Sequence, residues 1–118
     1  MKYLVTGSSG HLGEALVRTL TALRHEVVGI DVKPSKTTTL VGSIADRGFV
    51  EKTIHNVDAV LHPATLHKPH VVTHSYQDFV ETNISSTLNL LESAITAGVS
   101  RFVFTSTTSA HLAALDKQ

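Results

Sequence analysis

The sequence predicts an α/β fold in which helices cover both faces of a parallel sheet of about five strands, a doubly wound arrangement. Two observations predict it. Short apolar runs alternate with longer segments in which apolar residues recur at helical spacing. Three glycines, Gly7, Gly10 and Gly13, separate the first apolar run from the first helical segment. Right-handed crossovers between parallel strands then favour the strand order 3-2-1-4-5.

The first three elements follow directly from the residue pattern. Residues 2–6 form a short apolar run that is typical of a strand, and residues 11–24 carry apolar side chains at helical spacing. No glycine follows this helix, so Arg24 or His25 must end it in a left-handed conformation, which costs on the order of 1 kcal/mol. Residues 26–31 are expected to form the second strand.

The middle of the chain predicts two further strands around a short helix. Four of the five residues 37–41 are β-branched, and the segment lies between Pro34 and Gly42, which is typical of a short third strand. Asp46 can cap a helix that continues to about Asn56. The inward-facing residues of this helix are expected to be Phe49, Val50 and Ile54. The next strand is predicted at Ala59-Val60-Leu61-His62.

A long helix precedes the last predicted strand. Ser75-x-x-Asp78 resembles a partial capping box at its start, and Gly98 takes the usual glycine position after its end. Its apolar residues fall on one face of the helix: Val80, Ile84, Leu88, Leu91 and Ile95. Residues 101–105 form the last strand, and we expect this strand and the apolar face of the helix to be open to self-association or a homodimer.

Length and composition narrow the function classes. Residues 1–118 suit one domain, and ten basic residues balance ten acidic ones, which does not favour a nucleic-acid or membrane partner. The absence of cysteine excludes disulfides and thiolate metal sites and suits the cytoplasm. Four of the eight histidines lie close together, at His62, His67, His70 and His74. Since no cysteine or glutamate accompanies them, we expect no metal site there, and the histidines are expected in a solvated loop or in one that lines a substrate cleft.

The three glycines predict a dinucleotide-binding loop. Gly7 allows a tight turn, Gly10 allows the backbone to approach a pyrophosphate, and Gly13 allows the helix to pack closely on the strand. The amides at the start of the helix would face the phosphates. Because a strand precedes the pattern and a helix follows it, a cofactor site is favoured over a glycine-rich turn without a ligand.

Asp31 indicates which dinucleotide binds. It ends the second strand, where a carboxylate can accept hydrogen bonds from both hydroxyls of the adenosine ribose and would repel a 2′-phosphate. NAD is therefore favoured over NADP. Lys33 and Lys36 lie close by and keep NADP open, and a solvated turn residue is the alternative reading of Asp31.

Four motifs in order resemble the extended short-chain dehydrogenase/reductases, the NAD-dependent epimerase/dehydratase family. They cover residues 1 to about 109: Thr6-Gly7-Ser8-Ser9-Gly10-His11-Leu12-Gly13, Val60-Leu61-His62-Pro63-Ala64-Thr65, the helix segment 82–92 and the strand segment 98–107. The resemblance implies a Rossmann-type sheet and a bound dinucleotide.

The resemblance also implies roles for individual residues. The loop residues Gly7, Ser9, Gly10, His11, Leu12 and Gly13 would lie along the pyrophosphate. Asp31 and Val32 would contact the adenosine half, together with Ser43 and Ile44, although the family has an aspartate where Ser43 stands. On the nicotinamide side, the implied residues are Pro63, Ala64, Thr65, Asn83 and Thr105. Thr107 would be the catalytic hydroxyl that bonds the substrate oxygen, with Thr105 and Ser106 as register alternatives.

One departure from the family concerns the chemistry. In the family a Tyr-x-x-x-Lys pair supplies the general acid/base and holds the nicotinamide ribose. Here Gly7 and Val80 stand four residues after Tyr3 and Tyr76, so neither tyrosine forms the pair. The chain therefore resembles the N-terminal, cofactor-binding part of a longer enzyme.

Two functions remain in competition at this point. The first is the NAD-binding part of an epimerase, dehydratase or reductase that acts by hydride transfer on a nucleotide sugar or another small carbonyl or hydroxyl compound. The second is a dinucleotide-binding or interaction module without catalysis.

Overall fold

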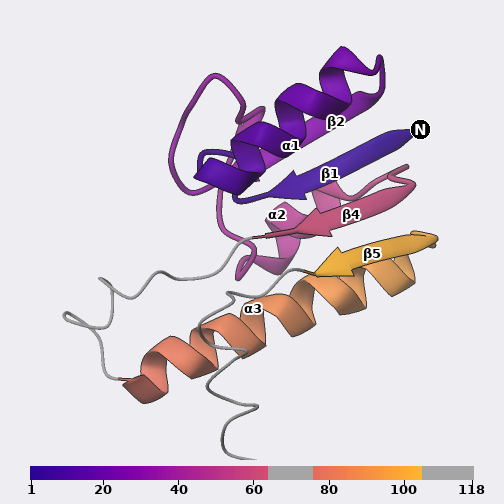
Figure 1. Cartoon of the computed structure of the whole chain (residues 1–118). Coiled ribbons are helices and arrows are strands. Elements are labelled where there is room, and N and C mark those ends of the chain that lie inside the picture. Colours follow the sequence, from indigo (N-terminus) through magenta and orange to yellow (C-terminus); the bar gives the residue numbers. More distant parts are fainter. Residues whose placement is uncertain (64–75, 105–118) are drawn as a thin grey trace, which may run out of the picture.

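The protein contains a five-stranded parallel sheet (Figure 1). The computed structural model describes residues 1–63 and 76–104, and within the second stretch the side chains from Ile84 onward. The strands are β1 (Lys2–Thr6), β2 (Glu26–Asp31), β3 (Leu40–Val41), β4 (Ala59–His62) and β5 (Arg101–Phe104). Their order is β3-β2-β1-β4-β5 and every neighbouring pair is parallel, which confirms the predicted topology.

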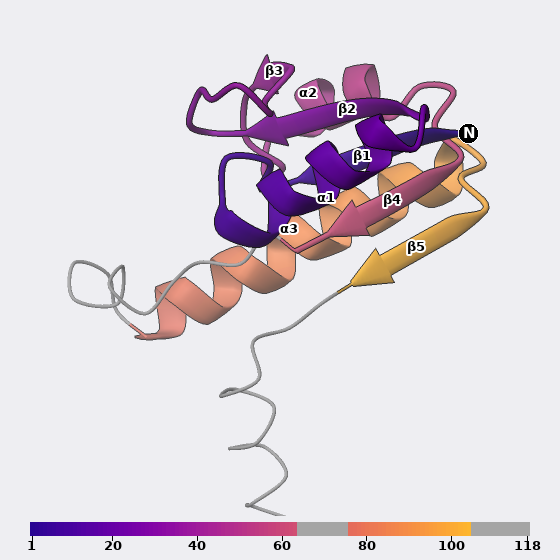
Figure 2. The ribbon, with the colours of Figure 1, turned by 45° about the horizontal axis from the view of Figure 1, so that its top comes forward.

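Helices lie on both faces of this sheet, as a doubly wound fold requires (Figure 2). The helix α1 (His11–Ala22) contacts β1 and β2 on one face. On the opposite face, α2 (Arg47–Thr53) packs against α3 (Tyr76–Thr96). Each crossover therefore covers the strands that it connects, and the carboxyl ends of all the strands meet at one edge of the sheet.

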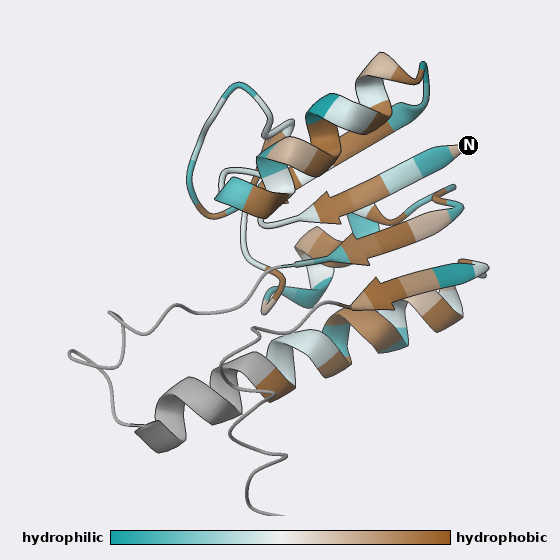
Figure 3. Cartoon of the chain, viewed as in Figure 1, coloured by the Kyte–Doolittle hydropathy of each residue, from teal (hydrophilic) through white to brown (hydrophobic). Residues whose placement is uncertain are grey.

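The main hydrophobic core lies between the sheet and the pair α2 and α3. It is built from strand residues that alternate toward this face and from the inner sides of the two helices: Leu4, Ile30, Val50, Ile54, Val57, Val60, Leu90 and Ala94. Figure 3 shows the apolar colour concentrated along the central strands. Phe49 packs against this cluster, and Val50 and Ile54 belong to it, which confirms the predicted inward face of α2.

Two predicted helix ends are confirmed. Arg24 follows α1 with φ of 67°, so a non-glycine residue does adopt the left-handed conformation there. Asp46 is the N-cap of α2, and its carboxylate accepts a hydrogen bond from the Phe49 amide at 3.2 Å. The helix ends at Thr53, earlier than the expected Asn56, and Asn56 is itself left-handed with φ of 60°.

The prediction of a strand over residues 37–41 was wrong for its first three residues. Only Leu40 and Val41 pair with β2, beside Ile30 and Asp31. The three preceding threonines instead use their hydroxyl groups in hydrogen bonds to the loop after β1 and to β2. Threonine favours strands by its shape, but here its polar atoms find partners outside the sheet ladder.

The apolar stripe of α3 faces away from the sheet. Ile95 is 71% exposed, and the described members of the stripe, Ile84, Leu88, Leu91 and Ile95, are all exposed. Smaller residues, Ser86, Ser93 and Ala94, face the sheet beside Leu90. On β5, Val103 and Phe104 are each 48% exposed. The expectation that this helix and strand present open apolar surface is therefore confirmed.

Candidate functional site

The candidate site lies where the carboxyl ends of β1, β2 and β4 meet the start of α1 (Figure 1). In open α/β sheets, ligands bind outside this edge because the connecting loops diverge there to opposite faces. The register pairs Val5 of β1 with Leu61 of β4 and Thr6 with Ile30 of β2. Residues that follow these strands are thereby brought to one edge.

The glycine loop, residues 7–13, is folded so that Gly13 has no room for a side chain and Gly7 adopts a backbone conformation that favours glycine. Gly7 has φ of 62°, the left-handed region that favours glycine. A Cβ atom on Gly13 would lie 2.0 Å from the carbonyl oxygen of Gly7. The start of α1 therefore packs directly on the turn after β1, in the manner predicted for a dinucleotide loop.

The N-terminus of α1 has no side-chain cap. Its N-cap residue is Gly10, which has an extended backbone and no side chain to accept from the first-turn amides. The Glu14 amide makes the first hydrogen bond of the helix, to the Gly10 carbonyl at 2.9 Å. The amides of the first turn, together with the positive end of the helix dipole, are thus suited to an anion. His11 and Leu12 in this turn are exposed.

Asp31 is held beside the glycine loop by backbone amides. The Ser9 amide donates to Oδ2 at 3.1 Å, and the Lys33 amide donates to Oδ1 at 2.9 Å. Each carboxylate oxygen keeps a further lone pair. A half-buried carboxylate fixed in this way can accept hydrogen bonds from two neighbouring hydroxyl groups, such as those of a ribose.

The segment after β3 is fixed by α3. The side-chain amide of Asn89 donates to the carbonyl oxygen of Ile44 at 2.6 Å, and Ile44 packs against the core. The Ser43 hydroxyl accepts from the Ala45 amide at 3.1 Å. Val32, which follows Asp31, is 63% exposed. Val32, Ser43 and Ile44 follow β2 and β3, so they form the side of the candidate site farther from β4.

A buried histidine stands at the end of β4. The Nδ1 atom of His62 lies 2.6 Å from Oγ1 of Thr6, and its Nε2 atom lies 3.1 Å from Oγ1 of Thr87 on α3. The ring also packs near Phe102 and Phe104. Burial lowers the pKa of His62 to about 4, so the ring is neutral at physiological pH. Because Pro63 follows directly, this triad of Thr6, His62 and Thr87 fixes the end of β4 beside Pro63.

The structure brings most of the predicted cofactor residues to this edge. These are Gly7, Ser9, Gly10, His11, Leu12, Gly13, Asp31, Val32, Ser43, Ile44 and Pro63. Asn83 lies within α3, where its side chain is not described. Five predicted residues lie outside the described residues: Ala64, Thr65, Thr105, Ser106 and Thr107. The histidines at 67, 70 and 74 lie outside them too, and the described part of the chain holds no metal-ligating cluster.

Sequence reasoning missed three positioning side chains. Asn89 and Thr87 belong to the helix segment 82–92 that carries part of the family resemblance, but the sequence assigns them no role. Thr38 was predicted only as part of a strand. Their roles depend on partners 25 to 45 positions away, so no local pattern marks them.

The described part of the chain also has no helix with the length and apolarity needed to cross a membrane.

Comparison with known proteins places these features in a family. Residues 3–114 match the model of the NAD dependent epimerase/dehydratase family. A 3-beta-hydroxysteroid dehydrogenase of Mycolicibacterium neoaurum is 37% identical over 118 residues, which cover 92% of this chain and 32% of that protein. A 2-alkyl-3-oxoalkanoate reductase of Stenotrophomonas maltophilia is 31% identical, with 92% and 34% covered.

Solved structures share the fold. A short-chain dehydrogenase/reductase superfamily protein from Agrobacterium tumefaciens with bound NAD superposes with a TM-score of 0.78 at 34% identity, covering 91% of this chain and 33% of that one. The UDP-glucose 4-epimerase of Thermotoga maritima, solved with UDP-glucose, gives 0.80 at 28% identity, with 91% and 38% covered. The chain thus spans about a third of the length of the relatives that it matches. With the glycine loop, the acidic end of β2 and the sheet order all agreeing with the family match, the chain belongs to the NAD-dependent epimerase/dehydratase family.

Proposed function

We propose that this chain is the NAD-binding part of an epimerase, dehydratase or reductase. The observation that carries the proposal is the pairing of an uncapped helix N-terminus with Asp31, joined by the 3.1 Å contact between the Ser9 amide and Oδ2. One element offers amides to a pyrophosphate and the other offers a carboxylate to a ribose. Neighbouring structures of the family contain NAD, which supports this assignment.

The residues present fit the cofactor. The Gly13 position leaves no room for a Cβ atom, so α1 begins directly against the loop, and the amides of its uncapped first turn would face the phosphate oxygens. Gly7, Ser9, Gly10, His11 and Leu12 would surround the pyrophosphate, while Val32, Ser43 and Ile44 would border the adenosine. The bound nicotinamide would supply hydride transfer, and the protein would bind and orient it. Pro63 and the His62 triad would hold the backbone on the nicotinamide side.

A charge-insertion experiment tests the proposal. Gly10→Glu places a carboxylate where the pyrophosphate would lie, so NAD binding should be lost. The control is Gly48→Glu in α2, an exposed position where a Cβ atom would meet nothing nearer than 3.5 Å. Calorimetric titration with NAD should give heat for wild type and for the control only. Equal binding by all three proteins, or no binding by any at millimolar NAD, would contradict the proposal.

The substrate class is a further proposal. The relatives include a steroid dehydrogenase and a reductase by name, and one structural neighbour contains UDP-glucose. A nucleotide sugar or another small carbonyl or hydroxyl compound suits this set. Thr107 remains the proposed hydroxyl toward the substrate oxygen, with Ala64, Thr65, Asn83 and Thr105 on the nicotinamide side.

A dinucleotide-binding module without catalysis is the second candidate. The observation that favours it is that no lysine stands four residues after Tyr3 or Tyr76. In the family's pair, the neighbouring ammonium lowers the pKa of the phenol and makes it a better general base near neutral pH. Binding of NAD without turnover would support this candidate for the chain by itself.

Self-association is proposed through open apolar surface. The stripe Ile84, Leu88, Leu91 and Ile95 on α3 is exposed, and Val103 and Phe104 of β5 are half exposed. An apolar patch of this kind commonly marks an interface, and a two-fold contact is the commonest way to cover it. A homodimer is therefore our proposed state, and the cytoplasm remains the proposed location because the cysteine-free composition suits it.

A further inference from the structure

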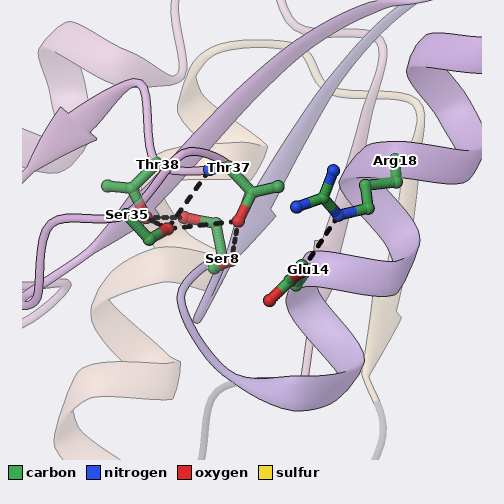
Figure 4. Close-up of polar contacts among 6 residues, drawn as sticks. All are labelled: Ser8, Glu14, Arg18, Ser35, Thr37 and Thr38. Atoms are coloured by element: carbon green, nitrogen blue, oxygen red, sulfur yellow. Dashed lines mark hydrogen bonds and ion pairs between the residues drawn. The ribbon is translucent and has the colours of Figure 1, made fainter.

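Hydroxyl groups from two separate segments converge at the glycine loop (Figure 4). The hydroxyl cluster consists of Ser8 and Ser9 on the glycine loop and Ser35, Thr37 and Thr38 on the segment after β2. The Oγ1 atom of Thr38 lies 2.6 Å from Oγ of Ser8, 2.6 Å from Oγ of Ser9 and 3.0 Å from Oγ of Ser35. Thr38 is therefore the central member of the cluster. The Glu14–Arg18 ion pair in the same view is a separate, exposed contact on α1.

The direction of the hydrogen bonds follows from the number of protons. The Ser9 hydroxyl donates its one proton to the carbonyl oxygen of Lys33, so Thr38 must donate to Ser9. Thr38 then accepts from Ser8, and Ser35 divides its proton between Thr38 and Thr37. The result is a directed chain from Ser8 through Thr38 and Ser9 to the Lys33 carbonyl, in which each bond polarises the next.

The segment can reach the glycine loop only because Gly29 lets it cross β2 closely. A Cβ atom on Gly29 would lie 2.2 Å from the Thr37 carbonyl oxygen and 2.8 Å from Cβ of Ser8. The Thr37 hydroxyl donates to the Ser8 carbonyl at 2.7 Å, and the Thr39 amide donates to the Gly29 carbonyl at 2.7 Å. The contact between the two segments is thus built into β2 itself.

The hydroxyl cluster controls the surroundings of Asp31 through Lys33. The Lys33 amide donates to Asp31, and its carbonyl accepts from Ser9, so both polar backbone atoms of this residue are fixed. While the segment is held, the carboxylate is placed to accept a hydrogen bond from a ribose 2′-hydroxyl. A 2′-phosphate at the same place would be repelled by its charge. Release of the segment would let Asp31 turn away and let Lys33 and Lys36 approach a phosphate.

We propose that Thr38 is a specificity-determining positioning residue, which selects NAD against NADP by holding residues 33–38 against the glycine loop. The inference rests on the proposed function. It goes beyond that function because it assigns the choice of cofactor to a residue that touches neither the ribose nor its phosphate. Thr38 acts through Ser9 and Lys33, which fix the Asp31 carboxylate.

Two variants and one control test the proposal. Thr38→Val removes the central hydroxyl and keeps the shape, whereas Ser35→Ala removes an exposed hydroxyl that bonds Thr38 and also accepts from the Thr37 amide. The control is Thr21→Val, the same substitution at an exposed position on α1. NAD and NADP are titrated by calorimetry against each protein, and thermal unfolding confirms that each is folded. Hydrogen exchange of the Ser9 and Lys33 amides reports on Asp31 without any ligand.

We expect the ratio of the NADP to the NAD dissociation constant to fall about fivefold in Thr38→Val, the effect of one hydrogen bond of ordinary net strength. Ser35→Ala should lower the ratio less, and the control should leave it unchanged. The two amides should exchange faster in Thr38→Val. An unchanged ratio, or an equal loss of both affinities, in an NAD-selective protein overturns this inference alone. A wild type that binds neither dinucleotide overturns the proposed function and this inference with it.

Discussion

Nδ1 of His62 and Oγ1 of Thr6 lie 2.6 Å apart, and both residues are almost completely buried at the carboxyl ends of two adjacent strands. The opposite ring nitrogen faces Thr87 of α3 at 3.1 Å. A neutral imidazole has one donor and one acceptor, and two threonine hydroxyls can satisfy both. This pair therefore joins β1, β4 and α3 at the place where the glycine loop begins, and its strength depends on the ring staying neutral.

The stability of the protein should fall in acid because of His62. Burial lowers its pKa from 6.5 to about 4, so between these values the unfolded state binds a proton that the folded state does not. The contribution of the neutral His62 ring to the free energy of unfolding is therefore fully present above pH 6.5. It is lost progressively as the pH falls to about 4, by roughly 3 kcal/mol in total. Denaturant unfolding at several pH values measures the slope.

The matched variant for this prediction is His62→Gln, which keeps a donor and an acceptor but does not titrate. It should have a flatter dependence on pH than wild type across this range, whereas His55→Gln at an exposed position should keep the wild-type slope. If His62→Gln and wild type lose stability in parallel, the buried ring is not the cause.

Asp31→Ser should narrow the preference for NAD over NADP. The substitution removes the charge that repels a 2′-phosphate and one acceptor for the ribose, so NAD should bind roughly tenfold more weakly, or about 1.4 kcal/mol. The NADP affinity should fall less or rise. Competition titrations with both dinucleotides measure the two constants. A wild type that already prefers NADP would show that Lys33 and Lys36 dominate the site.

The chain by itself should show no turnover. General acid/base help is typically worth about 10²- to 10⁴-fold, and neither tyrosine of the sequence has a lysine four residues later. We expect no NADH formation or consumption above a buffer blank with a panel of nucleotide sugars. Activity would show that another group, for example one of the histidines, replaces the tyrosine.

Self-association should depend on the exposed stripe of α3. Light scattering across a concentration series should show a mass above that of the monomer, and Leu88→Lys should reduce it because a charge in an apolar interface is costly. Val103→Lys tests β5 in the same way, and Leu23→Lys near the end of α1 is the exposed control. A monomer at high concentration in wild type would contradict both interfaces.

Local patterns predicted much of the fold. The strands 26–31 and 59–62 were identified from compact apolar runs, and both form as expected. Asp46 was identified as a cap because a short acceptor before an apolar helix satisfies amides that lie only a few residues away. The absence of a glycine predicted that Arg24 or His25 would end the first helix in a left-handed conformation, and in the structure Arg24 does so.

What the sequence determined by itself was therefore the set of interactions between residues close together in the chain, along with the motifs that predict a dinucleotide site. The tertiary structure decided which side of α3 meets the sheet, because close approach of a helix requires small residues such as Ser93 and Ala94, while the apolar stripe is left outside. It also decided the partners of Thr38 and His62. A hydroxyl or an imidazole can bond to many groups, and only the fold determines which of them come within hydrogen-bonding distance once water is excluded.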